Sequence, residues 1–153
     1  MFHVRPREGE VVTALGSTYT TKSDGREVAG AYSLVEERFW GDPTPLHRHL
    51  DAEEAFYVLE GRVALWVEGD EVIAEPGAFV VVPRGAAHAA RRVDGEVRML
   101  TLFSPAGVQG FFSAVVEEGE AELLEDPDRL IELAAAYRTE VLGEHPAADG
   151  ESA

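Results

Sequence analysis

The apolar residues between residue 11 and about residue 103 recur in short segments that predict β-strands. Turns separate these segments, among them Ser23-Asp24-Gly25, Glu68-Gly69-Asp70 and Asp94-Gly95. Strand-length segments between glycine-bearing turns are typical of an antiparallel sandwich or barrel. Phe79-Val80-Val81-Val82 is apolar on both faces, which predicts a strand in the middle of the fold. The strand over 97–103 has two alternatives: either Met99, Thr101 and Phe103 face inward, or Leu100 and Leu102 do.

After residue 105 the pattern changes to helical spacing. A first helix is predicted over 108–116, carrying Phe111, Phe112, Val115 and Val116 on one side. A second helix is predicted from Asp126 as N-cap and Pro127 at its first position, with Gly143 just past its end. Its apolar stripe comprises Leu130, Leu133, Ala134, Tyr137 and Val141. We expect this stripe to pack on the outside of the barrel or on a second subunit.

Length and charge restrict the class of protein. The 153 residues fit one domain with a sizeable core. The net charge of −16 repels phosphate backbones and makes nucleic acid an unexpected partner. No cysteine is present, which excludes disulfides and thiolate metal sites. No apolar run approaches a membrane span, and the first residues lack a signal-peptide hydrophobic region, so we expect a cytoplasmic protein.

Three histidines and one glutamate carry the candidate chemistry. His47 and His49 alternate, so on a strand they share one face while Arg48 points away. Glu54 follows closely, and His88 lies about one strand pair later. Imidazoles with one carboxylate suit Fe, Mn or Ni, with Zn, Co or Cu as alternatives, rather than Mg or Ca. The structural alternative, polar barrel residues hydrogen-bonded without metal, is less favoured because three buried imidazoles and a carboxylate are costly without a shared partner.

Glycines and a proline accompany these donors in two ordered patterns. The first is Gly41, His47-x-His49, Glu54 and Gly61; the second is Gly77, Pro83-x-Gly85 and His88. Together they resemble the two motifs of the cupin superfamily. The segments 54–61 and 104–112 are further similar to the bacterial quercetin 2,3-dioxygenase-like cupins. Arg92 departs from the family pattern, because the second motif commonly ends there with Asn.

The resemblance implies an all-β fold, a cupin (jelly-roll) antiparallel β-barrel with two C-terminal α-helices packed outside. We expect a single domain over 1–145, with the barrel over about 11–105 and the helices over about 108–143. The tail 146–153 is expected to be disordered, and His3 and His145 to be ordinary surface residues. Small cupins usually pair, so the resemblance also implies a homodimer, formed through the C-terminal helices or the N-terminal strands.

The carboxylate ligand has two candidates, because the family spacing tolerates three or four residues after the second histidine. Both Glu53 and Glu54 qualify, and the six residues between Glu54 and Gly61 favour Glu54. On that choice Glu53 turns outward as a solvated charge.

The substrate-binding candidates are Arg92 and aromatic residues. By strand parity Arg92 lies on the face of His88, where it could hold an anionic substrate group or form a salt bridge. Phe39, Trp40, Phe56 and Phe103 are the aromatic residues expected to shape the pocket, although core packing is the simpler role for each.

The expected function is a metal-dependent dioxygenase of the quercetinase-like kind, acting on a small enolisable or phenolic, flavonol-like substrate. His47, His49, Glu54 and His88 would hold one divalent transition metal, and the resemblance suggests that Glu54 also acts as the catalytic base. Two alternatives stay open. One is non-redox isomerase or decarboxylase chemistry with the same ligands, and the other is a non-catalytic cupin that binds a small ligand.

Overall fold

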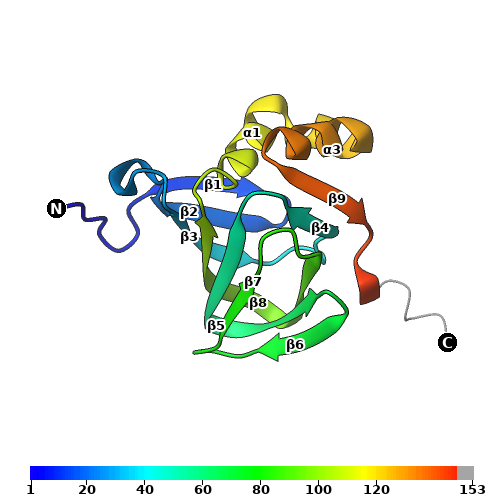
Figure 1. Cartoon of the computed structure of the whole chain (residues 1–153), viewed down its shortest axis with the longest axis horizontal. Coiled ribbons are helices and arrows are strands. Elements are labelled where there is room, and N and C mark those ends of the chain that lie inside the picture. The colour runs from blue at the N-terminus through cyan, green and yellow to red at the C-terminus, as the bar shows by residue number, and fades with distance from the viewer. Residues whose placement is uncertain (148–153) are drawn as a thin grey trace.

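The expected antiparallel β-fold with C-terminal helices is confirmed by a computed structural model, which describes residues 1–147 (Figure 1). The strands are β1 (Glu10–Ala14), β2 (Ser17–Ser23), β3 (Ser33–Phe39), β4 (Leu46–His49), β5 (Glu53–Val67), β6 (Asp70–Ala74), β7 (Phe79–Val82), β8 (His88–Ser104) and β9 (Thr139–Gly143). The helices are α1 (Gly110–Glu118), α2 (Glu120–Glu125) and α3 (Pro127–Ala136), and a 3₁₀ turn spans Arg26–Val28. The helices gather on one side of the curled sheet, and β6 lies on the opposite side (Figure 1).

All strand pairs are antiparallel. One path of the sheet runs β1-β2-β3-β8-β4-β9, and β5 pairs with β6, β7 and β8. The long β5·β8 ladder joins Glu53 to Ser104 at one end and Val67 to His88 at the other. Its register shifts between Val58 and Val63, where Gly61 adopts a φ of 76°. Such irregularities bend a ladder, and the bend allows the two ends, which carry Glu54 and His88, to approach each other.

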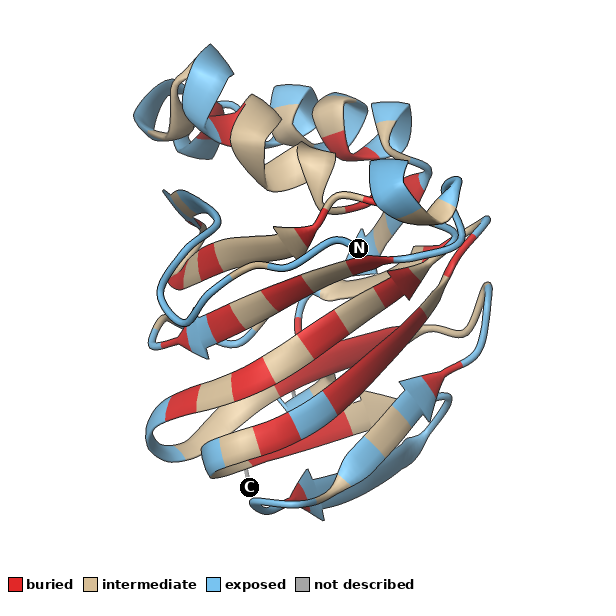
Figure 2. Ribbon diagram, turned by 90° about the vertical axis from the view of Figure 1, so that its left-hand side faces the viewer, coloured by how far each residue is buried: buried red, intermediate tan, exposed pale blue. Residues whose placement is uncertain are grey.

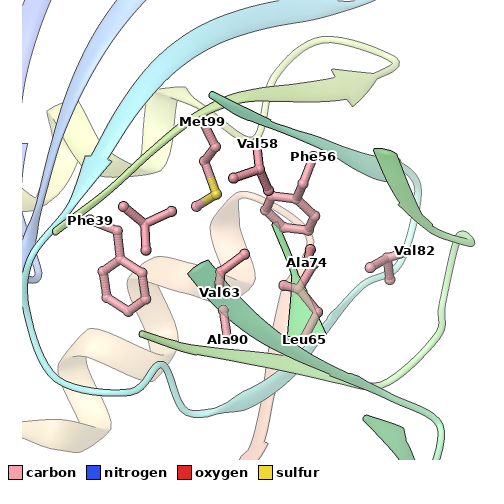
Figure 3. Close-up of a cluster of buried hydrophobic side chains, with 10 residues drawn as sticks. Phe39, Phe56, Val58, Val63, Leu65, Ala74, Val82, Ala90 and Met99 are labelled. Carbon is pink, nitrogen blue, oxygen red and sulfur yellow. The ribbon is translucent and has the colours of Figure 1, made fainter. Parts of the chain in front are cut away.

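Alternating burial along the strands defines the inside of the barrel. In β3 and in the second half of β8, buried residues alternate with half-buried or exposed ones, visible as bands in Figure 2. Met99, Thr101 and Phe103 are buried, which decides between the two alternatives for this strand. Ten buried side chains form the main core, nine of them labelled in Figure 3: Phe39, Phe56, Val58, Val63, Leu65, Ala74, Val82, Ala90 and Met99, with Val97 as the tenth.

The prediction that 79–82 lies in the middle of the fold is wrong. β7 pairs with β5 alone, and the side chains of Phe79 and Val81 are 65% and 47% exposed. Val82 is buried in the core, so one face of the strand packs inward and the apolar outer face is exposed.

The helical region differs from the two expected helices. Gly119, with a φ of 93°, separates α1 from an additional short helix α2. Asp126 caps α3 as expected, its side chain accepting a hydrogen bond from the Arg129 N–H. The helix nevertheless ends at Ala136, because the chain turns at Arg138 (φ 57°) and continues as β9.

β9 pairs with β4, opposite the histidines: Thr139 lies across from His49 and Val141 from His47. Val141 therefore belongs to a strand, and Tyr137 caps the end of α3. The remaining helical stripe packs on the outside of the barrel. Leu130 and Leu133 join Val115 and Leu123 in a cluster against Ala14 of β1. Val116 departs from this pattern and is 50% exposed.

The ends of the chain modify two expectations. His3 is exposed as expected, whereas His145 is buried, and its Nδ1 accepts a hydrogen bond from the Ala147 N–H. Residues 148–153 of the expected disordered tail lie outside the described residues. Within 1–147, none of the helices has the length and apolar character needed to cross a membrane.

Candidate metal centre

Four side chains from three strands converge at one point inside the barrel. His47 and His49 come from β4, Glu54 from β5 and His88 from β8. One potential ligand atom from each residue lies within 4.8 Å of the others. His49, Glu54 and His88 are buried and His47 is half-buried. Direct pairing of His47 with His88 across β4 and β8, together with the bend in β5·β8, brings these residues together.

The outer nitrogen of each imidazole has a hydrogen-bonding partner. His47 Nδ1 donates to the Pro45 carbonyl at 2.8 Å and His88 Nδ1 to the Ala86 carbonyl at 3.0 Å. Because a carbonyl only accepts, both rings carry their proton on Nδ1 when neutral and leave Nε2 as a free electron pair. His49 Nδ1 lies 2.9 Å from the Thr139 hydroxyl. Such partners fix the ring orientation of metal-ligating histidines.

The two glutamates face opposite sides of β5. Glu54 Oε2 lies 3.0 Å from His49 Nε2 and 2.8 Å from His88 Nε2. Glu53 is half-buried, and its carboxylate pairs with the Arg84 guanidinium at 3.2 Å. The structure therefore brings Glu54, and not Glu53, to the histidines.

The pKa values of Glu54, His47 and His88 are shifted by burial and by the contacts among the four side chains. Burial alone would raise the pKa of Glu54, but hydrogen bonds from His49 and His88 outweigh it and hold the pKa well below its usual value. Burial, followed by the neighbouring His88 and His49, lowers the pKa of His47 to about 3. Burial opposes protonation of His88, whereas its hydrogen bond to Glu54 raises its pKa above the ordinary value. Binding of a metal would replace the hydrogen bond between Glu54 and His88 and would require His88 to release its proton.

The donor set fits a transition metal. It offers three imidazoles, two with the Nε2 electron pair free when neutral, and one carboxylate that is ionised at neutral pH. Nitrogen and oxygen donors of this kind bind first-row divalent ions. As ligands, these four residues would leave coordination positions for water or a substrate, which distinguishes such a site from a closed structural one.

Among the four aromatic residues expected to shape the pocket, Phe103 lies beside the histidines, with its ring edge-on to that of His49 at 5.6 Å between centroids. Phe39 and Phe56 belong to the main core and are 2% and 4% exposed. Trp40 is 47% exposed, on the surface. For Phe39 and Phe56 this is the core-packing role that was expected as the simpler one.

Arg92 is held by backbone carbonyls rather than by the salt bridge that was one of its two expected roles. Its inward position is as predicted, because it lies opposite the core residue Val63 on β5. Its guanidinium donates from Nε to the Gly41 carbonyl at 2.9 Å and from Nη1 to the Gly95 carbonyl at 2.8 Å. It also lies four residues beyond His88, about 13 Å along the strand. Arg92 thus connects two backbone turns away from the metal centre.

Two features near the centre escaped the sequence analysis. A cavity of about 420 Å³ opens beside His49, lined among others by Asp51, Pro105, Val108, Tyr137 and Arg138. The second is Glu37 of β3, a buried carboxyl group. Its alternation with Val35 and Phe39 was the available signal, since it places all three on one face of the strand.

Comparison with known proteins finds a domain match in the sequence and similar folds among solved structures. A family model described as the cupin domain matches residues 41–103. Quercetin 2,3-dioxygenase of Bacillus subtilis is 30% identical over 83 residues, which is 54% of this chain and 25% of that protein. An uncharacterized protein of Aquifex aeolicus is 32% identical over 60 residues, 39% of this chain and 50% of that protein. The chain thus matches a quarter to a half of the length of these relatives.

Solved structures share the fold. KdgF from Halomonas sp. superposes with a TM-score of 0.58 at 20% identity, covering 69% of this chain and 94% of KdgF. A protein of Acidithiobacillus ferrooxidans, assigned provisionally as a sugar phosphate isomerase, has a TM-score of 0.52 at 28% identity, covering 67% of this chain and 71% of that one. Residues 41–103 of this chain thus match the cupin domain, and the antiparallel barrel and the two motifs agree with that match.

Proposed function

We propose that His47, His49, Glu54 and His88 bind one divalent transition metal and that this centre acts on a small organic substrate. The observation that carries the proposal is the orientation of the rings. Three elements bring four donors within 4.8 Å of one another, and the Pro45, Thr139 and Ala86 oxygens hold the outer nitrogens away from the centre. Metal-ligating histidines characteristically have their other ring nitrogen held by a hydrogen bond of this kind.

The reaction that we favour is dioxygenation of an enolisable or phenolic, flavonol-like substrate. A bound Fe, Mn or Ni ion would lower the pKa of such a substrate and support its reaction with O₂. Glu54, held ionised between two imidazoles, is the group placed to accept the substrate proton. The similarity to the Bacillus subtilis quercetin 2,3-dioxygenase supports this choice of reaction.

The cavity beside His49 is the route that we propose for the substrate. Its walls include the apolar side chains of Pro105 and Val108 and the ring of Tyr137. Asp51 and Arg138 form an ion pair at 2.6 Å among its lining residues. Apolar walls with a few polar groups suit a small aromatic or enolic molecule.

Isomerisation or decarboxylation with the same ligands is the second candidate. The 28% identity to the protein provisionally assigned as a sugar phosphate isomerase favours it. It would use the ion to polarise a carbonyl oxygen and would consume no oxygen. The third reading, a cupin that binds a small ligand without reaction, predicts tight binding with no turnover.

Oxygen uptake discriminates among these functions. Protein reconstituted separately with Fe(II), Mn(II) and Ni(II) is expected to consume oxygen with at least one member of a flavonol and diketone panel. Protein treated with chelator is the control and should lose this activity. Substrate loss without oxygen uptake would favour the second candidate, and unchanged substrate after prolonged incubation would favour the third.

We further propose that a second copy of the chain covers the apolar outer face of the β7-β5-β8-β3 sheet. Strand register places Val81, Ala55, Leu102 and Leu34 in one row and Phe79, Tyr57 and Leu100 in the next. An ion pair flanks this outer face at each end. Glu53 pairs with Arg84 at one end, and Glu60 pairs with Arg98 at the other. A twofold-related copy would thus place apolar rows together and opposite charges at their margins. The expected helix-mediated contact is less suited, because the helical stripe packs on the chain's own β1.

Phe79→Ser is expected to weaken the dimer at least about tenfold, because this side chain is the most exposed of the outer face. Sedimentation across a concentration series measures the effect. Leu124→Ser is the matched control, since Leu124 is 58% exposed on α2, away from the outer face. A wild-type protein that stays monomeric at high concentration would contradict the proposal.

A further inference from the structure

Glu37 is a buried carboxyl group outside the proposed metal site. It lies on the inner face of β3, directly between Tyr19 of β2 and Met99 of β8. Its Oε1 accepts a hydrogen bond from the Ser17 hydroxyl at 2.8 Å and its Oε2 accepts one from the Thr101 hydroxyl at 2.9 Å. The residue is 8% exposed, and the ring of Phe112 stacks on Tyr19 at 3.8 Å beside it. Both oxygens are satisfied by neutral donors alone.

No positive side chain within residues 1–147 forms an ion pair with Glu37. The titratable groups facing it are Tyr19 from β2 and Glu54 from β5, while β8 contributes Thr101 and Met99. Burial raises the pKa of Tyr19, and the nearby Glu37 raises it further, so the phenol is neutral. Thr101, which donates to Glu37, lies two residues from Phe103, and Phe103 pairs with Glu54 across β5 and β8. Glu37 therefore lies close along the inner face to the negative charge of Glu54 at the proposed metal centre.

We infer that Glu37 responds to the charge of the metal centre, holding its proton to higher pH when the metal is absent and releasing it to solvent when the metal binds. The inference rests on the proposed metal site. In the absence of metal, two carboxylates share a buried interior, and the second charge is disfavoured by burial and by the first. A divalent cation on Glu54 reverses the sign of that local charge, so ionised Glu37 becomes favourable.

The expected pH range follows from the metal-free protein. Burial raises the pKa of Glu37 to about 7, with the Ser17 and Thr101 hydrogen bonds opposing this shift and Glu54 adding to it. Near pH 7 about half of the molecules then carry the proton before the metal binds. Because the metal favours the ionised form, Glu37 should add to metal affinity as the pH rises through about 7. At about pH 5.5 its contribution should vanish.

Zn²⁺ titration by calorimetry, in buffers of different ionisation enthalpy, counts the protons released per ion and gives the affinity. Glu37→Gln is expected to release about half a proton less than wild type at pH 7. At pH 8 it should bind Zn²⁺ on the order of tenfold more weakly. Glu36→Gln is the matched control, because Glu36 faces outward and pairs with Arg98 at 3.3 Å. It should behave as wild type.

Thr101→Val provides an independent variant that keeps the carboxyl group. It removes one hydrogen bond that favours ionised Glu37, so the extra proton release should move to higher pH. Should Glu37→Gln prevent folding, this variant carries the test. Equal proton release by wild type, Glu37→Gln and Glu36→Gln would overturn the inference while leaving the metal site intact. Absence of Zn²⁺ binding by wild type would instead overturn the proposed metal site, and the inference with it.

Discussion

Replacing Glu54 by glutamine is expected to lower metal affinity more than about 100-fold, while Glu53→Gln leaves it within about twofold. The neighbouring carboxylates differ in what they face. Glu54 Oε2 lies within 3.0 Å of both His49 Nε2 and His88 Nε2, whereas Glu53 pairs with Arg84 at the surface. Loss of residues that merely orient ligands commonly costs 10- to 100-fold in affinity, so loss of a ligand should cost more. Exposed ion pairs contribute little.

Metal content after equilibrium dialysis, measured by elemental analysis, checks this prediction for both variants. Glutamine keeps the size of Glu54 and one acceptor oxygen, so thermal unfolding of the metal-free variant should remain close to that of wild type. A protein that loses metal with Glu53→Gln, and keeps it with Glu54→Gln, would overturn the assignment of the carboxylate ligand.

Local pattern was sufficient for the strands before residue 105 and for the site histidines, because both depend on alternation along one strand. His47 and His49 share a face for the same reason that Met99, Thr101 and Phe103 do. Alternation alone did not tell which face of β8 is internal. Leu100 and Leu102 on its other side are also apolar, since they belong to the outer face, and the choice depends on which strands close the barrel.

The incorrect predictions share a physical cause, namely long-range pairing. Val141 follows Tyr137 at helical spacing, yet residues 139–143 form β9 because β4 offers a partner about 90 residues earlier in the chain. The two apolar faces of β7 suggested a central strand, although one face packs inward and the other belongs to the apolar outer face. Sequence alone does not distinguish a face covered by the same chain from one available to another.

For two inward-facing residues, Arg92 and Glu37, the hydrogen-bond partners could not be predicted from the sequence. Parity placed Arg92 inward correctly, but its partners are carbonyls of Gly41 and Gly95 that the folded turns bring to it. Glu37 was overlooked because a glutamate in a strand is ordinarily solvated. Its burial depends on hydroxyl groups of Ser17 and Thr101, which lie 20 and 64 residues away in sequence. Such partners have no local signature.

Gly41→Ala is expected to lower the free energy of unfolding by about 3 kcal/mol, the upper range for overpacking. A Cβ atom on Gly41 would lie 2.4 Å from the Cα of Gly16, in the turn between β1 and β2. Backbone cannot move aside as a flexible side chain can, and the Gly41 N–H also donates to the Gly16 carbonyl at 2.7 Å. The first glycine of the cupin pattern is thus required in this chain for the contact between two backbone turns.

Gly77→Ala is the matched comparison within the second pattern, and it should cost only about 1 kcal/mol. Gly77 has a φ of 91°, which strains any other residue, but a Cβ atom there would meet nothing within 4 Å. Thermal unfolding of the metal-free proteins measures the loss of stability in both variants. The melting temperature of Gly41→Ala should fall by roughly 10 °C. Equal effects would show that backbone conformation, and not the Gly16 contact, determines the requirement for glycine.

Gly41→Ala also tests whether the contact between Gly41 and Gly16 positions the proposed metal ligands. Between Gly41 and His47 the chain is attached to β8 a second time, since the Thr44 N–H donates to the Ala90 carbonyl and the Thr44 hydroxyl accepts from the Ala90 N–H. That attachment lies closer to the ligands than Gly41 does and should absorb a shift of the turn. We therefore expect folded Gly41→Ala to bind metal with wild-type affinity. A folded variant with weakened metal binding would mean that the Gly16 contact, and not the Thr44–Ala90 pair, sets the position of His47.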